Sequence, residues 1–304
     1  MSEQTPNPRK KQSVGKQILF VVMILALVVV LAIGLDARMI VQCYEIDAPA
    51  VSSQIRIVLV TDLHSCYYGK DQEKLIRAID AQAPDLLLLG GDIFDDEMSD
   101  TNTELFLAGI SGRYPCYYVT GNHEYWSGTE NFQQKMAILE KYGITILSNV
   151  CKAIQIRGET INLCGVDDPD SYMLRFDKAL DPYGYQTAKD QQLDTFDQHL
   201  DAVRSQAHQA HFTILLSHRP ELFAHYASRG FDLVLCGHAH GGQWRIPGLL
   251  NGLYAPNQGL FPPYAGGRYE KDSTTMIVSR GLARESTFVP RIFNPPELVV
   301  ITIN

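Results

Sequence analysis

The sequence predicts an α/β domain that follows a single N-terminal transmembrane helix. The chain has 304 residues, of which 45% are hydrophobic, enough to bury a sizeable core. One apolar run near the N-terminus carries no charge, and beyond residue 53 short apolar runs alternate with segments whose apolar residues recur at helical spacing. We therefore expect four parts: a basic cytoplasmic tail (1–16), a transmembrane anchor (17–35), a linker (36–53) and one folded domain (54–304).

The uncharged run Ile18–Leu35 is long enough to cross a bilayer as a helix, whereas the apolar core of a signal peptide is typically shorter. Four basic residues precede it: Arg9, Lys10, Lys11 and Lys16. The positive-inside rule places this basic side in the cytoplasm, so we expect a single-pass protein of the cell membrane with an extracytoplasmic domain. Small residues at positions 32 and 34 also suit signal cleavage, and secretion after cleavage is the alternative.

The outward part of the chain is acidic. Residues 1–16 carry a net charge of +3, so the total of −8 leaves −11 on the remaining residues. Such a surface does not attract nucleic acid over long range, and we expect no nucleic-acid partner. An anionic substrate would need local positive charge, such as bound metal ions.

The six cysteines show no zinc-finger or CxxC spacing. Cys151 and Cys164 flank a predicted hairpin with its turn at residues 158–159, where they would lie diagonally on one face. At that separation they could form a disulfide or remain thiols.

Within the domain, apolar runs predict strands and the segments between them predict helices. The expected strands are 55–60, 85–90, 116–119, 144–147, 153–156, 160–166, 212–217 and 232–236. The expected helices are 71–82, 100–110, 131–142 and 191–207. From about Gly248, short runs between Gly- and Pro-rich turns, ending at 298–303, indicate a second and mostly antiparallel sheet.

Five of the predicted strands are followed by carboxylate, carboxamide or imidazole side chains. The segments are DLH, GGD, GNHE, SH and GHAH, and their polar residues are Asp62, His64, Asp92, Asn122, His123, Glu124, His218, His238 and His240. Each segment alone is an ordinary turn or cap. Because the carboxyl ends of strands share one edge of an open α/β sheet, together they predict one crevice. Oxygen and imidazole ligands without thiolates suit Mn, Fe or Zn in a two-metal site.

These five blocks, in this order, resemble the motif blocks of the calcineurin-like metallophosphoesterases over about residues 54–304. The resemblance implies a four-layer α/β/β/α sandwich with a dimetal site at the carboxyl ends of its strands. ILLSHRPELF, GFDLVLCGHAHGGQWRIPG and the tail SRGL to PRIFNPPEL further resemble a bacterial membrane-associated branch. That branch includes cell-wall phosphoesterases and enzymes that hydrolyse UDP-diacylglucosamine at its pyrophosphate. A phosphoester or pyrophosphate substrate is therefore expected, and a lipid- or wall-linked phosphodiester, a nucleotide-sugar lipid and a small phosphoester are the alternatives.

The resemblance also implies the roles of the site residues. One divalent metal ion, with Mn favoured, would be held by Asp62, His64 and His240, the other by Asn122, His218 and His238, with Asp92 bridging both. Two ions about 3.5 to 4 Å apart would activate a shared hydroxide for in-line attack on phosphorus. His123 follows a ligand directly, so we expect it to act without binding metal, as the general acid that protonates the leaving oxygen.

Three further residues are candidates for substrate contact: Arg219, Gln243 and Arg291. Each has a structural alternative, since either arginine could pair with an acid and Gln243 could cap its loop. Glu124 could orient His123 or be a solvated loop acid. A catalytically silent metal-binding scaffold on the same fold is the alternative function, but the presence of every ligand and of His123 favours an enzyme.

Overall fold

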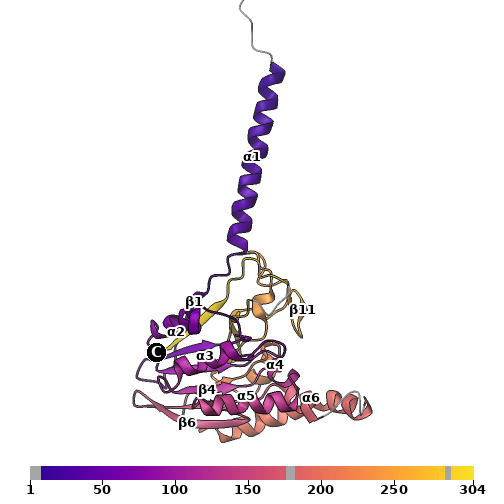
Figure 1. Ribbon diagram of the computed structural model, residues 1–304. Helices are drawn as coiled ribbons and strands as arrows, with labels where there is room; N and C mark the ends of the chain where they lie inside the picture. Colours follow the sequence, from indigo (N-terminus) through magenta and orange to yellow (C-terminus); the bar gives the residue numbers. More distant parts are fainter. Residues whose placement is uncertain (1–7, 176–181, 285–288) are drawn as a thin grey trace, which may run out of the picture.

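The computed structural model describes residues 8–175, 182–284 and 289–304. Helix α1 (Pro8–Gly34) extends away from the rest of the molecule as one straight helix (Figure 1). Its stretch Gly15–Gly34 has the length and apolar composition needed to cross a membrane. The other described residues form two six-stranded sheets with helices on their outer faces, and a small two-stranded sheet near the C-terminal part of the chain.

The first sheet has the strand order β1-β14-β2-β3-β4-β5. Its strands are β1 (Ile40–Ile46), β2 (Ile55–Val60), β3 (Leu86–Gly90), β4 (Cys116–Val119), β5 (Thr145–Ile146) and β14 (Glu297–Ile303). The second sheet has the order β12-β13-β9-β8-β7-β6. Its strands are β6 (Val150–Ile156), β7 (Glu159–Gly165), β8 (Thr213–Leu216), β9 (Leu233–Cys236), β12 (Gly267–Lys271) and β13 (Thr274–Val278).

Helices cover both outer faces. The first sheet packs against α2 (Glu73–Asp80), α3 (Thr101–Ile110) and α5 (Thr129–Lys141), and the second against α6 (Pro182–Gln206) and α7 (Phe223–Ala227). Strand β2 explains why the sequence pattern was clear: Ile57 and Leu59 pack between the sheets, whereas Val58 and Val60 face the helices. A strand that is buried on both faces reads as a continuous apolar run. The predicted four-layer sandwich is confirmed.

The linker prediction is wrong for part of its length, because Ile40–Ile46 forms the edge strand β1, which pairs in parallel with β14. Its side chains are mostly exposed or half-buried, and it includes Gln42 and Glu45, so it lacks the apolar signature of a core strand.

The prediction of a second, mostly antiparallel sheet after Gly248 is wrong for most of its length: the two-residue strands β10 (Tyr254–Ala255) and β11 (Gly259–Leu260) do form a small antiparallel sheet, but the longer strands join the two large sheets. Strands β12 and β13 extend the second sheet, with β13 parallel to β9, and β14 inserts between β1 and β2 of the first sheet. These pairings join segments that are far apart in the sequence, so local patterns do not reveal them.

Cys151 and Cys164 are bonded as a disulfide. They lie directly opposite each other in the β6–β7 hairpin, not diagonally as expected. The reason is the position of the turn: Ile156 pairs with Glu159, so the two-residue loop is Arg157-Gly158, with positive φ angles of 51° and 85°. This geometry is typical of a type I′ turn, and it shifts the register from that of the predicted turn.

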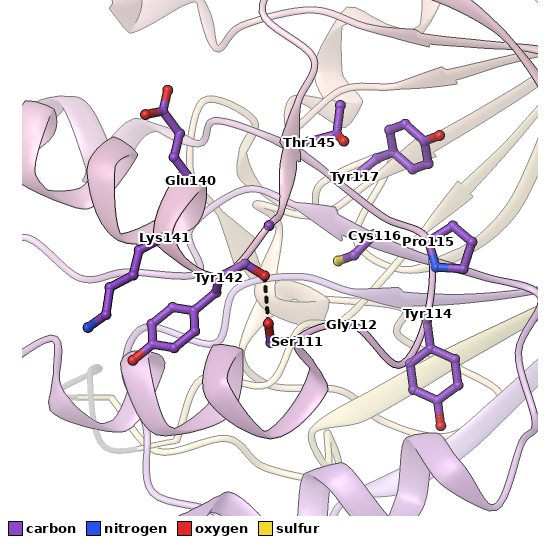
Figure 2. Close-up of a pocket in the computed structure, with 11 residues that line it drawn as sticks. Ser111, Gly112, Tyr114, Pro115, Cys116, Tyr117, Glu140, Lys141, Tyr142 and Thr145 are labelled. Carbon is purple, nitrogen blue, oxygen red and sulfur yellow. Dashed lines mark hydrogen bonds between the residues drawn. The ribbon is translucent and has the colours of Figure 1, made fainter.

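A surface pocket of about 430 Å³ lies at the amino ends of β4 and β5 (Figure 2). Its lining includes Tyr114, Pro115, Tyr142 and Thr145, and Ser111 Oγ donates to the Tyr142 carbonyl across it (2.9 Å). The pocket is at the end of these strands opposite to the motif blocks, so it is separate from the candidate site.

Candidate metal centre

The five motif blocks meet at one place, but they come from both sheets. DLH, GGD and GNHE follow β2, β3 and β4 of the first sheet, whereas SH and GHAH follow β8 and β9 of the second. The expectation of a single open sheet is corrected in this respect. Several candidate ligands have positive φ angles, namely Asp62, His64, Asp92, His238 and His240. Such backbone strain in non-glycine residues is concentrated at functional sites.

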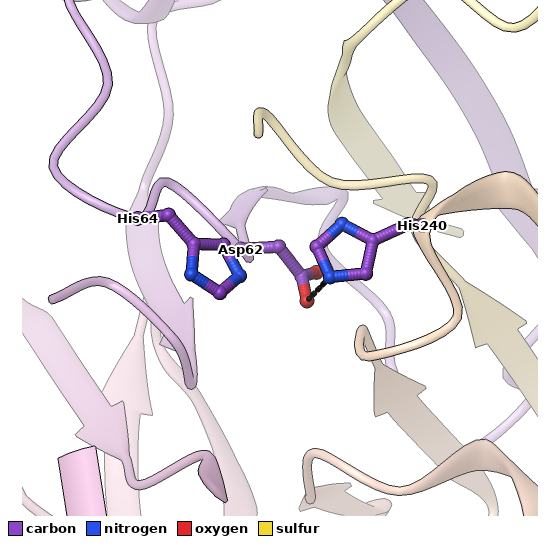
Figure 3. Close-up of side chains that lie close together, drawn as sticks. All are labelled: Asp62, His64 and His240. Carbon is purple, nitrogen blue, oxygen red and sulfur yellow. Dashed lines mark ion pairs between the residues drawn. The ribbon is translucent and has the colours of Figure 1, made fainter. Parts of the chain in front are cut away.

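The first group consists of Asp62, His64 and His240, whose ligand atoms lie within 4.8 Å of one another. The two imidazoles flank the carboxylate of Asp62 (Figure 3). His64 Nδ1 donates to Asp95 Oδ2 (2.9 Å), which leaves Nε2 for the group. Asp62 Oδ2, His64 Nε2 and His240 Nδ1 are buried without a hydrogen-bond partner in the described part of the chain.

The second group consists of Asp92, His218 and His238. His218 Nδ1 donates to the carbonyl of Gly90 (2.9 Å), and His238 Nε2 donates to Asn257 Oδ1 (2.8 Å). These bonds fix each ring and leave the other nitrogen free for a metal ion, as protein metal sites commonly do. Asn122 Oδ1 is also buried and, among the residues described, has no partner.

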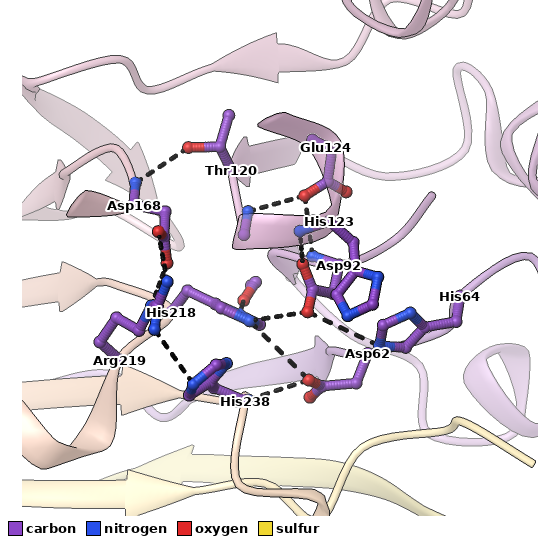
Figure 4. A network of polar contacts seen from close by, with 12 residues as sticks. Asp62, His64, Asp92, Thr120, His123, Glu124, Asp168, His218, Arg219 and His238 are labelled. Carbon is purple, nitrogen blue, oxygen red and sulfur yellow. Dashed lines mark hydrogen bonds and ion pairs between the residues drawn. The ribbon is translucent and has the colours of Figure 1, made fainter. Parts of the chain in front are cut away.

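Asp92 lies between the two groups (Figure 4). Its Oδ2 is 3.0 Å from His218 Nε2 in the second group and 3.6 Å from His64 Nε2 in the first. This is the position that a bridging ligand needs.

Two glycines leave room for the carboxylates of Asp92 and Asp62 to lie against the backbone of the neighbouring loops. A Cβ at Gly121 would overlap Asp92 Oδ1, and a Cβ at Gly237 would lie 2.5 Å from Asp62 Oδ2.

The electrostatics of the site favour bound cations. Burial lowers the pKa of His218, but the carboxylates of Asp92 and Asp62 outweigh it and raise the pKa to about 10. His64 behaves in the same way, because its bond to Asp95 and the charge of Asp92 raise its pKa despite burial. Within the described residues, only imidazoles form ion pairs with Asp62 and Asp92. Two buried carboxylates whose charge is met by imidazoles alone, together with ligand atoms that lack hydrogen-bond partners, fit two divalent ions.

His123 differs from the other imidazoles in its exposure. Its side chain is 24% exposed, compared with 2% for His64, and its ring is 4.4 Å from that of His64 and perpendicular to it. Its backbone N–H donates to Asp92 Oδ1 (2.9 Å), and Nδ1 donates to Asp96 Oδ1 (2.5 Å). His123 is therefore open to solvent at the edge of the two groups.

Sequence reasoning missed Asp95 and Asp96, which hold His64 and His123. Asp95 is itself fixed by the backbone N–H groups of Glu97 and Met98. The signal was an acidic pair three and four residues after Asp92, in GGDIFDDE. A His64–Asp95–His123 group also has the spacing of a metal site. However, His64 Nδ1 already hydrogen-bonds to Asp95 Oδ2 and His123 Nδ1 to Asp96 Oδ1, so we interpret this group as support for the first two.

Glu124 fits neither of its expected alternatives. It is fully buried and accepts hydrogen bonds from the backbone N–H groups of Asp92, Ile93, Phe94 and Gly121 (2.7 to 3.1 Å). It therefore joins the GGD loop to the GNHE loop. Burial and the charge of Asp92 raise the pKa of Glu124 to about 7.

Arg219 pairs with protein groups. Its Nε and Nη2 donate to Asp168 (2.5 and 2.8 Å) and its Nη1 to Asn257 (2.7 Å). Arg291 donates to the carbonyls of Ala283 and Arg280 (2.8 Å each). Gln243 ends the short turn η4 (His240–Gly242), and its Oε1 is buried without a partner in the described part. Substrate contact by these three residues stays a prediction.

Comparisons with known proteins agree with this site. The family model of the calcineurin-like phosphoesterases matches residues 55–242, which is more than half of the chain. An uncharacterized metallophosphoesterase of Helicobacter pylori is 30% identical over 236 residues, covering 76% of this chain and 55% of that protein. An uncharacterized metallophosphoesterase of Aquifex aeolicus is 27% identical over 270 residues, covering 86% of this chain and 91% of that protein.

A transmembrane protein with metallophosphoesterase domain from Bos taurus is 29% identical over 248 residues, covering 77% of this chain and 50% of that protein. The chain thus spans about half the length of the H. pylori and bovine relatives. A solved dimetal phosphatase of Danio rerio is similar with a TM-score of 0.47 and 12% identity, covering 75% of this chain and 88% of that one. By its family match and its five motif blocks, the chain belongs to the calcineurin-like phosphoesterases.

Proposed function

We propose that this chain is a membrane-anchored, metal-dependent hydrolase of phosphate esters or pyrophosphates whose domain faces out of the cytoplasm. The observation that carries the proposal is the pair of buried groups around Asp62 and Asp92, whose ligand atoms converge, several of them without a hydrogen-bond partner in the described part of the chain. A lipid- or wall-linked substrate follows from the resemblance to the membrane-associated branch.

The ligand atoms divide between two ions. Asp62, His64 and His240 would hold one ion, Asn122, His218 and His238 the other, and Asp92 both. When bound, two divalent ions, with Mn favoured, supply positive charge for the phosphoryl oxygens and lower the pKa of the attacking water.

His123 supplies the proton for the leaving oxygen. Asp96 accepts from His123 Nδ1, which orients the ring and leaves Nε2 to face the substrate. Asp96 is thus a positioning residue. Glu124 holds the backbone of Asp92 and of Gly121 together, so that His123 and the bridging carboxylate keep their relative position.

Removal of metal tests the reaction directly. Treatment of the purified full chain with a chelator should abolish hydrolysis of a generic phosphodiester, and added Mn should restore it, because the carboxylates cannot activate water alone. Metal content measured on the same samples provides the control. Full activity in metal-free protein would contradict the mechanism, and an inactive protein that is fully loaded with metal would support the scaffold.

Three observations support the anchor and its orientation. The stretch Gly15–Gly34 is long and apolar enough to span a bilayer, and its side chains are exposed. The basic residues before it favour a cytoplasmic N-terminus. The Cys151–Cys164 disulfide lies in the domain, and such bonds persist in oxidising compartments.

Cys43 is a natural probe of the orientation, because it is exposed on β1 just after α1, whereas the other free cysteines are buried. A membrane-impermeant maleimide should label the chain in intact cells, and Cys43→Ser should abolish the labelling. Labelling that requires permeabilised cells would reverse the orientation.

A further inference from the structure

Large apolar side chains are exposed on the loops that follow the GHAH block. We define the apolar rim as Trp244, Ile246, Leu249, Tyr254, Leu260 and Phe261, which are between 41% and 83% exposed. Leu249 is the most exposed member, and Phe261 has a positive φ angle of 56°. An exposed apolar cluster of this kind marks an interaction surface.

The rim adjoins the end of α1. The backbone N–H of Phe293 donates to the carbonyl of Gly34 at the end of α1 (2.7 Å), and neighbouring Ile292 forms a β-bridge with Trp244. From Trp244 the contacts continue through Leu253, whose N–H donates to the Trp244 carbonyl (2.9 Å) and whose carbonyl accepts from Phe261 (2.8 Å). The loops around β11 (Gly259–Leu260) accordingly lie beside the base of α1 in Figure 1.

The charge of the rim is unlike that of the rest of the domain. Between His240 and Tyr269 the chain has no Asp or Glu, although the outward part is acidic overall. Arg245 donates to Asn251 Oδ1 and to the Gly241 carbonyl, and it pairs with no carboxylate in the described part of the chain. It lines a pocket of about 440 Å³ together with Ile246, Leu249 and Phe293. A guanidinium that has no carboxylate partner and lies among apolar side chains suits the phosphate of a lipid head group.

We propose that the apolar rim is a bilayer-docking surface. Its Trp, Phe, Leu and Ile side chains would enter the boundary between head groups and acyl chains next to α1, with Arg245 at the level of the phosphates. The inference rests on the proposed function in one respect, that α1 spans the membrane. His240 lies four residues before Trp244, so docking holds the metal centre close to the membrane surface.

The chain offers a matched pair of probes, because its two tryptophans are Trp244 in the rim and Trp126, which is 56% exposed on α4 (Asn122–Trp126) beside His123. The full chain, as Trp126→Phe or Trp244→Phe, is reconstituted into phosphatidylcholine vesicles with bromine atoms near the head-group end of the acyl chains. We expect quenching of Trp244 to be several-fold stronger than quenching of Trp126. Equal quenching of the two, or none of either, would overturn the proposal.

A second variant separates docking from anchoring. In the Trp126→Phe background, the double substitution Leu249→Asp and Phe261→Asp should remove the quenching of Trp244, while the protein still resists alkaline extraction from the vesicles and still hydrolyses a soluble phosphodiester. Quenching that persists in this variant would contradict docking by the rim. Loss of the wild-type chain on extraction would instead show that α1 is no anchor. A dimer in detergent that shields Trp244 from lipid would assign the rim to a second copy of the chain and overturn the proposal.

Discussion

Replacing Asp92 with alanine should remove both metal ions and reduce phosphodiester hydrolysis by about 10³-fold or more, since bound metal contributes several kcal/mol of transition-state stabilisation. The physical reason is the position of the Asp92 carboxylate, which lies 3.0 Å from His218 of the second group and 3.6 Å from His64 of the first group. Mn should raise the unfolding temperature of the wild type, because only the folded state holds the complete ligand set, and it should not raise that of the variant. Metal analysis, initial rates and thermal unfolding measure the three effects.

Two further variants make the result interpretable. Asp92 Oδ1 also accepts the N–H of His123, and Asp92→Asn keeps an acceptor of the same shape, so metal loss in both variants would point to the charge. Asp194→Ala, on the exposed face of α6, removes an acid far from any candidate ligand in the sequence and should change neither metal content nor rate. Retention of both ions by Asp92→Ala would refute the bridging role.

The sequence was sufficient to predict the buried strands in the central layers of the fold. Strands such as β3 and β9 are buried on both faces, so their apolar runs were unambiguous. Strand β1 is exposed at the sheet edge, and its place is decided by backbone pairing with β14, about 250 residues later. Such pairing depends little on side-chain type, so no local sequence pattern predicts it.

The sequence predicted which residues form the candidate site, but not which residues hold their side chains and loops in place. The ligand types are fixed by chemistry and stand at strand ends, where the sequence displays them. The roles of Asp95, Asp96 and Glu124 depend instead on where each side chain points. Glu124 reaches the backbone of Asp92, which lies 32 residues earlier, and so its burial could not be read from its neighbours.

Replacing His123 with asparagine should leave both ions in place and slow the hydrolysis of a substrate with a poor alkoxide leaving group by roughly 10² to 10⁴. The ring is partly exposed and its Nδ1 bonds to Asp96, so the substitution removes a proton donor without opening the core. A substrate with a good phenolate leaving group needs less proton donation, and its rate should fall less. Rates on the two substrates, measured together with metal content, check this prediction.

A matched control is available, because His225 donates to Asp197 through Nδ1 (2.8 Å) with a side-chain exposure of 31%, close to that of His123. His225→Asn removes a similar histidine–aspartate pair from α7 and should alter neither rate, which excludes a general effect of losing such a pair. If His123→Asn lost its metals, His123 would be a ligand, as the spacing of His64, Asp95 and His123 allows. If it slowed both substrates equally, His123 would stabilise charge on the phosphoryl group in the transition state. Only a larger effect on the poor leaving group, with both ions retained, identifies proton transfer to the leaving oxygen as the function of this residue.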